Sequence, residues 1–69
     1  MEHTYEVQMY DRDKQSPTFE HMIAVCGTND EVCAMQDWQR YLSIAKRSGK
    51  MSVTFIDRIN EKENTVWVL

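Results

Sequence analysis

The fold is decided by residues 28–49, which read TNDEVCAMQDWQRYLSIAKRSG. Thr28 and Glu31 fit the capping-box pattern, in which a hydroxyl accepts a hydrogen bond from the backbone three residues on and the carboxylate reaches back. At the other end, Lys46 falls in the last turn, where the helix dipole favours cations, and Gly49 suits a left-handed cap. We therefore predict one helix of about five turns between these two ends.

The apolar residues of this predicted helix share one face. At about 100° per residue, the apolar side chains fall within about 60° of Trp38, whereas Arg40 points away. This stripe consists of Ala34, Met35, Trp38, Tyr41, Leu42 and Ala45. The helix is thus amphipathic, and we expect its Trp38 side to pack on a sheet.

Two segments before the helix alternate in the way that half-buried strands do. The first is His3–Tyr10, and the second is Thr18–Cys26. Between them, the polar segment Asp11–Pro17 reads as a loop. Because this connection is short, an antiparallel hairpin is the expected pairing of the two strands.

Two further strands are predicted after the helix, at Met51–Ile59 and at Thr65–Leu69, with the charged turn Asn60–Asn64 between them. The chain is then a single α+β domain, residues 1–69, with the order ββαββ and one helix packed on a four-stranded, mainly antiparallel sheet. We favour the strand order 2-1-3-4, in which the helix carries the chain across the first strand. The alternative, with the third strand parallel to the second and beside it, stays open at this point.

Composition bounds the class of protein. The chain has 69 residues, 42% of them apolar and 28% charged, with a net charge of −3, so it is neither a disordered tail nor a low-complexity chain. The longest apolar run, Met22–Cys26, is far shorter than the roughly 20 residues that cross a membrane, and the N-terminus MEHTYEVQMY does not read as a signal peptide. We expect a cytoplasmic protein whose two cysteines, Cys26 and Cys33, are reduced.

The residue types needed for catalysis are present but not in a recognisable pattern. Both glycines are expected at helix ends, which leaves no glycine-rich phosphate loop. Cys33 lies near the predicted helix N-terminus, which lowers the pKa of a thiol, but it points about 140° away from Trp38 and no histidine is placed beside it. His3, His21, Cys26 and Cys33 also lack the paired spacing of small zinc modules. We therefore expect no enzyme, no metal and no cofactor.

The supply of apolar residues instead favours protein binding. One helix covers one face of a sheet, and we expect that face to take Tyr5, Val7, Met9, Ile23, Val25, Val53, Phe55, Val66 and Val68. The opposite face then carries Tyr10, Met22, Ala24, Ile56, Trp67 and Leu69, a set of the kind that marks interfaces. The acidic loop residues Asp11, Asp13, Glu61 and Glu63 would flank it and suit a basic partner. Our candidate protein-binding residues are Tyr10, Asp11, Asp13, Met22, Ile56, Glu61, Glu63 and Trp67.

Two alternatives remain beside this interpretation. The same surplus of apolar residues also fits a homodimer, formed through that face or through an unpaired edge strand. Direct binding of nucleic acid is the other alternative, through a basic patch of Arg40, Arg47, Lys50 and Arg58 near the end of the helix. The abundant carboxylates and the net charge of −3 weigh against it.

The order of elements resembles that of a known class of small proteins. The second strand FEHMIAV, the helix start TNDEV, and the tail segments SVTFIDRI and TVWVL carry the resemblance. It is to the single-domain α+β proteins that bacteriophages encode to inhibit host machinery, such as anti-CRISPR proteins, inhibitors of host RNA polymerase and antitoxins. The resemblance implies an anti-defence inhibitor that occupies the surface of a host protein or nucleoprotein complex in the host cytoplasm, without catalysis. It transfers no functional residue position by position.

Overall fold

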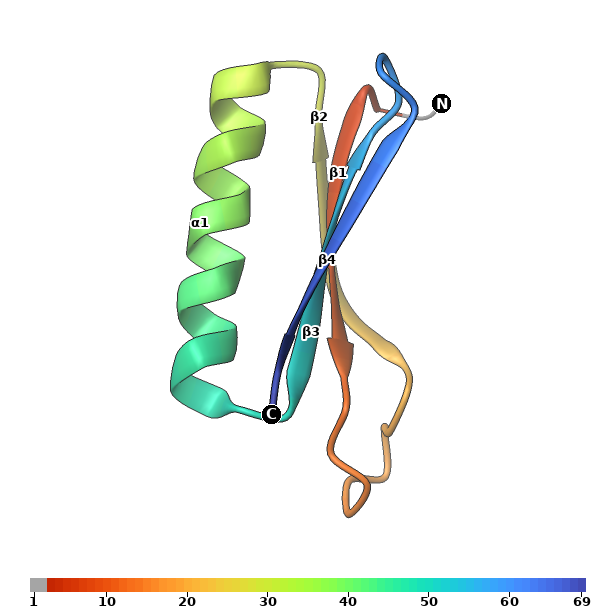
Figure 1. The fold of residues 1–69 in the computed structure, drawn as a ribbon, viewed down its shortest axis with the longest axis vertical. Helices are drawn as coiled ribbons and strands as arrows, with labels where there is room; N and C mark the ends of the chain where they lie inside the picture. The colour runs from red at the N-terminus through yellow and green to blue at the C-terminus, as the bar shows by residue number, and fades with distance from the viewer. Residues whose placement is uncertain (1–2) are drawn as a thin grey trace.

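The structure, a computed structural model, describes residues 3–69, so Met1 and Glu2 of the predicted domain lie outside the described residues. The described elements are β1 (Tyr5–Asp11), β2 (Met22–Thr28), α1 (Glu31–Ser48), β3 (Met51–Asp57) and β4 (Lys62–Val68). Within these residues the strands form one four-stranded sheet in the order β2-β1-β3-β4, and every neighbouring pair is antiparallel. The predicted ββαββ order and the favoured strand order are both confirmed, and α1 lies against one side of the sheet (Figure 1).

β1 is an inner strand, and its alternation sets the core. Tyr5, Val7 and Met9 are buried under α1, and Met9 lies opposite Val53 of β3. Burying apolar surface from both β1 and β3 under the helix is the main source of stability in a domain of this kind. The core cluster consists of Val7, Met9, Tyr41, Ala45 and Val53.

Small residues bring α1 close to the sheet. Ala34 and Ala45 have no exposed surface, and the Trp38 ring meets Phe55 edge-on at 5.7 Å between centroids. The predicted stripe is therefore correct around Trp38 and Tyr41 but wrong at Met35, which is 46% exposed. Met35 lies at the margin of the stripe, and α1 packs mainly on β1 and β3, so this margin extends beyond the contact.

The helix begins differently from the prediction. Asp30, and not Thr28, is the N-cap: its Oδ1 accepts from the backbone N–H of Val32 at 2.8 Å and of Cys33 at 3.3 Å. Thr28 is still paired with Tyr5 as the last residue of β2, so the helix can only start after it. Gly27 likewise lies inside β2 and not at a helix end.

The second strand differs from the prediction in both its start and its phase. β2 begins at Met22, because the chain before it is still part of the loop. Pairing with β1 puts Ala24 opposite Met9 and turns it toward α1, so the prediction that Ile23 and Val25 face the helix is wrong. The residues on both sides of this strand are apolar, so the alternation does not indicate which side faces the helix. An irregularity in the pairing with β1 at Met9 and Tyr10 also interrupts the alternation.

The last hairpin is longer than predicted, since β4 starts at Lys62 and not at Thr65. Its turn is tightened by Asp57, whose carboxylate accepts from the backbone N–H of Ile59 at 3.0 Å and from the side chain of Asn60 at 2.8 Å. Glu61 completes the turn with a φ of 53°.

We expect Asp30→Ala to lower the free energy of unfolding by about 1 kcal/mol, because two backbone donors of the first turn lose their acceptor. Urea unfolding followed by circular dichroism measures the change. Thr28→Ala is the matched control and should cost less, since Thr28 accepts only from the backbone of Asp30. A larger loss for Thr28→Ala would show that the helix is capped two residues earlier.

Candidate functional site

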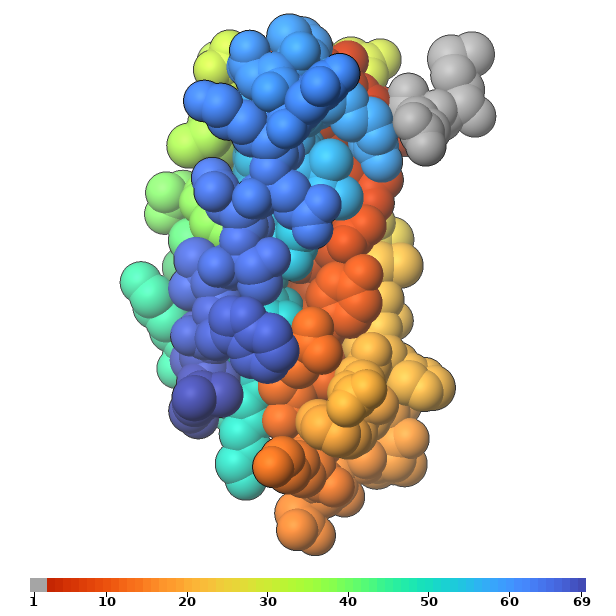
Figure 2. Space-filling model, turned by 45° about the vertical axis from the view of Figure 1, so that its right-hand side comes forward, coloured from red at the N-terminus to blue at the C-terminus, as the bar shows by residue number. Residues whose placement is uncertain are grey.

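The candidate site is the face of the sheet that is turned away from α1, which we call the open face. Antiparallel pairing places Tyr10, Ser52 and Trp67 in one row across three strands, and Gln8, Thr54 and Thr65 in the next. A third row holds Glu6, Ile56 and Glu63. In Figure 2 the strands of this sheet lie side by side, with β4 in blue at one margin and β2 in yellow at the other.

The open face is not the continuous apolar surface that the sequence predicts. Its middle row is polar, and the hydroxyls of Thr54 and Thr65 lie 2.9 Å apart in a hydrogen bond. The exposed apolar side chains lie instead at the two margins, with Trp67 on β4 and with Met22, Ile23 and Val25 on β2. Ala24, predicted here, faces the helix, and Leu69 lies beyond the end of β4 and is 89% exposed.

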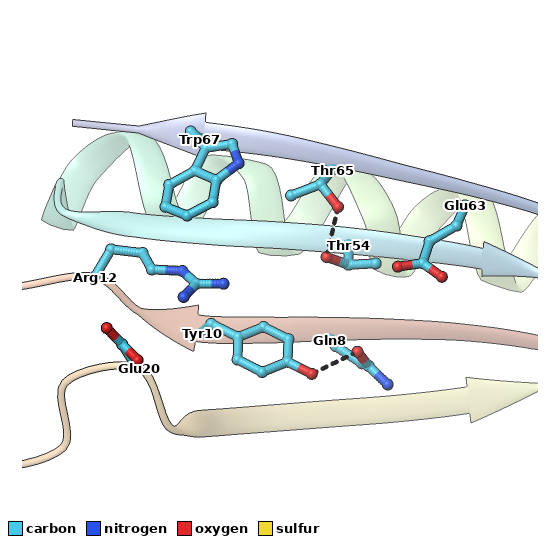
Figure 3. Close-up of a pocket in the computed structure, with 8 residues that line it drawn as sticks. All are labelled: Gln8, Tyr10, Arg12, Glu20, Thr54, Glu63, Thr65 and Trp67. Atoms are coloured by element: carbon cyan, nitrogen blue, oxygen red, sulfur yellow. Dashed lines mark hydrogen bonds between the residues drawn. The ribbon is translucent and has the colours of Figure 1, made fainter.

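Arg12 organises one end of the open face. Its guanidinium carbon lies 5.1 Å from the centroid of the Tyr10 ring and 4.4 Å from that of the Trp67 ring, so the cation is stacked with both aromatics (Figure 3). Its Nε donates to the hydroxyl of Ser52 at 2.9 Å, which supplies a partner for a side chain with no exposed surface. We call Tyr10, Arg12 and Trp67 the aromatic–arginine stack.

A groove runs from this stack over the polar row. It has a volume of about 450 Å³, and Figure 3 shows Glu20 beside its Arg12 end and Glu63 at the far end. Its floor is ordered, because the Tyr10 hydroxyl donates to Gln8 at 2.9 Å and Gln8 donates to Glu6 at 2.5 Å. The lining residues are Gln8, Tyr10, Arg12, Glu20, Thr54, Glu63, Thr65 and Trp67. Neither a cysteine nor a histidine is among them.

The predicted acidic residues do not form one ring around the face. Asp11 is only 7% exposed, and its carboxylate accepts from the Thr18 hydroxyl at 2.6 Å and from the backbone of Asp13 at 2.9 Å. Hydrogen bonds from Ser16 and Thr18, together with that backbone bond, lower the pKa of Asp11. Asp11 thus holds the β1–β2 loop together, while Glu61 is exposed in the β3–β4 turn.

Asp13 is in the same loop and lies 3.9 Å from Lys50 Nζ. Glu63, Tyr10, Ile56, Met22 and Trp67 are the predicted binding residues that the structure does bring to the open face or its margin.

The four predicted nucleic-acid-binding residues are spread over the molecule. Lys50 precedes β3, whereas Arg58 follows it, so the two lie at opposite ends of a strand of seven residues. Arg58 binds Glu6 at 3.5 Å and donates to the backbone oxygen of His3 at 2.6 Å. Arg40 pairs with Asp37 at 3.0 Å on α1, and Arg47 is exposed in the last turn of that helix. Arg58 therefore lies apart from Lys50, and Arg40 and Arg58 are each paired with a carboxylate.

The two cysteines occupy different environments. Cys26 is half-buried on the helix side of β2, and burial raises the pKa of its thiol, partly offset by a hydrogen bond with Tyr41. Burial also raises the pKa of Tyr41, to about 12. Cys33 is exposed on α1, and both thiols are free. Among the described residues, no group of three or more His, Cys, Asp or Glu side chains is placed to hold a metal ion.

Comparison with protein-family models, with curated proteins and with solved structures found no match to this chain. Within residues 3–69, no helix has both the length and the apolar character needed to cross a membrane. The site therefore rests on its own geometry. Sequence reasoning missed Arg12, which was assigned to the loop, although it continues the alternation of Gln8 and Tyr10 and so shares their side of β1.

The lowered pKa of Asp11 predicts a loss of stability in acid. A carboxyl whose pKa is lowered by folding stabilises the protein above its ordinary value of 3.8, and this contribution disappears as the pH falls through the lower folded-state value. We expect Asp11→Asn to be less stable than the original chain at neutral pH and nearly equal to it below this window. Urea unfolding at both pH values measures the difference. Glu61→Gln, at an exposed position, should keep the pH dependence of the original chain, and an equal gap at both pH values would contradict the assignment.

The cysteine environments predict a two-phase reaction with a thiol reagent at mildly alkaline pH. Cys33 should react fast because it is exposed, and Cys26 slowly because burial raises the pKa of its thiol. Release of the chromophore from an aromatic disulfide reagent follows both phases. Cys33→Ser should remove the fast phase alone, and its persistence in that variant would show that Cys26 is accessible.

Proposed function

We propose that the protein is a non-catalytic, cytoplasmic binding module that attaches to a partner protein through the aromatic–arginine stack on its open face. The observation that carries this proposal is the environment of Trp67. Trp67 is 56% exposed although its ring is held against the Arg12 guanidinium at 4.4 Å. A large aromatic side chain that is ordered before binding loses little conformational freedom when a partner covers it.

The composition of the stack supports the same proposal. Trp, Tyr and Arg are the residues that most often dominate the binding energy of protein interfaces, and here one of each meets at the end of a groove. The groove is polar and open along the face, and it can receive side chains of a partner between Trp67 and Glu63.

Charge indicates the kind of partner surface. Among the residues that line the groove, Arg12 is the one cation, and Glu20 and Glu63 are the two carboxylates. Because the chain as a whole carries −3, a partner with a basic surface is favoured during the encounter. In line with the resemblance to phage-encoded inhibitors, the proposed partner is a host protein or nucleoprotein complex, which the module would block by covering part of its surface.

The test is capture of the partner on immobilised protein, followed by a titration with the purified partner. We expect Trp67→Ala to weaken the complex by tenfold or more, roughly 1.4 kcal/mol, while circular dichroism shows an unchanged fold. Val32→Ala is the control, because Val32 is also an exposed apolar residue but lies on α1, away from the open face.

Two outcomes would overturn the proposal. Equal binding by the Trp67→Ala and original proteins would remove the open face from the interface. Loss of all captured protein after nuclease treatment, with only RNA or DNA recovered from untreated lysate, would favour nucleic-acid binding instead.

A further inference from the structure

We propose that the free edge of β2 pairs with the same edge of a second copy of this chain, in antiparallel orientation, to form a dimer with one continuous eight-stranded sheet. This inference does not depend on the proposed function, since it concerns the margin of the sheet and leaves the aromatic–arginine stack exposed. β2 is the outermost strand on its side of the described sheet, so a row of its backbone groups has no partner strand among the described residues.

The backbone groups that point outward can be identified. Asp11 donates its N–H to His21 and accepts from Glu20, on the β2 side, whereas Arg12 donates to Lys50, on the β3 side. Odd-numbered residues of β1 therefore bond toward β2, and Met9 and Val7 form hydrogen-bonded pairs with Ala24 and Cys26. By alternation, the N–H and C=O of Val25 and Gly27 point away from β1, toward the free edge.

The side chains of β2 do not protect this edge. Its seven residues read MIAVCGT and include neither a charge nor a proline, two of the features that natural edge strands use against pairing, and the irregularity in its pairing with β1 is confined to its first residues. Met22, Ile23 and Val25 are between 42% and 49% exposed. The opposite edge, β4, begins with Lys62 and Glu63 and is thereby less suited to pairing.

Identity of the two strands favours a two-fold arrangement. Within Ala24–Thr28, the part of β2 whose pairing with β1 is regular, the register centred on Val25 places Val25 opposite its own equivalent and Ala24 opposite Cys26 of the second copy. Val25 exchanges two backbone hydrogen bonds with its own equivalent, and the irregularity at Met22 and Ile23 ends the regular part of the ladder. Pairing β2 with β4 of another copy would leave a β2 edge free for a further copy and extend into a filament, whereas pairing β2 with β2 uses both β2 edges and stops at two copies.

The helices leave room for this arrangement. A two-fold axis perpendicular to the sheet places both copies of α1 on the same side. α1 contacts β1, β3 and, to a lesser extent, β2, so its axis lies near β1, about one and a half strand spacings, or about 7 Å, from the dimer axis. The two helices are then about 14 Å apart, more than the 8–10 Å at which helices touch, and do not collide.

The first experiment measures mass in solution by sedimentation over a range of concentrations up to millimolar. We expect the original chain to dimerise, and Val25→Lys to weaken the dimer by about tenfold or more, because it places two like charges opposite each other across the axis. Val66→Lys is the matched control: Val66 is an exposed valine on the other edge strand, and its substitution should leave the dimer intact. Because each copy carries −3, added salt should tighten the dimer.

The second experiment tests the register and does not depend on how Val25→Lys folds. Val25→Cys combined with Cys33→Ser should form an intermolecular disulfide on mild oxidation, since the Cα atoms of a hydrogen-bonded antiparallel pair lie about 5.5 Å apart, within disulfide range. Val66→Cys with Cys33→Ser should not. A monomeric original chain at every concentration, a dimer unaffected by Val25→Lys, or equal cross-linking of both cysteine variants would each overturn the proposal. If either Val25 variant loses its far-ultraviolet circular dichroism, the other one decides.

Discussion

A single helix about 10 Å across cannot cover a sheet of four strands spaced about 4.8 Å apart, and the rest of this structure depends on that mismatch. α1 covers the inner strands, where Val7, Met9 and Val53 lose nearly all contact with water. It leaves the opposite face without cover from within the described chain, and it covers the outer strands only in part, at residues such as Ala24 and Cys26. The functional surfaces proposed above are the parts of the sheet that the helix cannot reach.

The open face is subject to a second physical constraint. Its inner positions are buried although no helix lies above them, so the polar groups there need hydrogen-bond partners. Ser52 has no exposed surface and Thr54 is 6% exposed, so their hydroxyls need partners within the protein. Arg12 and Thr65 supply these partners. The same hydrogen bond that satisfies Ser52 holds Arg12 between the rings of Tyr10 and Trp67, so structural and functional roles meet in one side chain.

The β1–β2 loop connects this arrangement to the rest of the fold. Asp11 ends β1 and bonds to both Glu20 and His21 through its backbone, while its carboxylate orders the loop through Thr18. In the next residue, the backbone N–H of Arg12 donates to the backbone oxygen of Lys50, which directly precedes β3. The position of the stack is therefore set by the closure of the loop, and Figure 1 shows this loop extending beyond the end of the sheet.

By itself the sequence determined the α+β class, the ββαββ order and the amphipathic helix with Trp38 toward the sheet, because periodicity and end signals are local properties. It also indicated that Tyr10, Met22, Ile56 and Trp67 share the uncovered side. Only the tertiary structure decided the phase of β2, because both of its alternating sets are apolar and the pairing with β1 selects between them. The role of Asp30 over Thr28 and the place of Arg12 on the open face were decided in the same way. The local sequence was compatible with more than one N-cap residue and with a loop position for Arg12. Contacts between distant segments determined which arrangement forms.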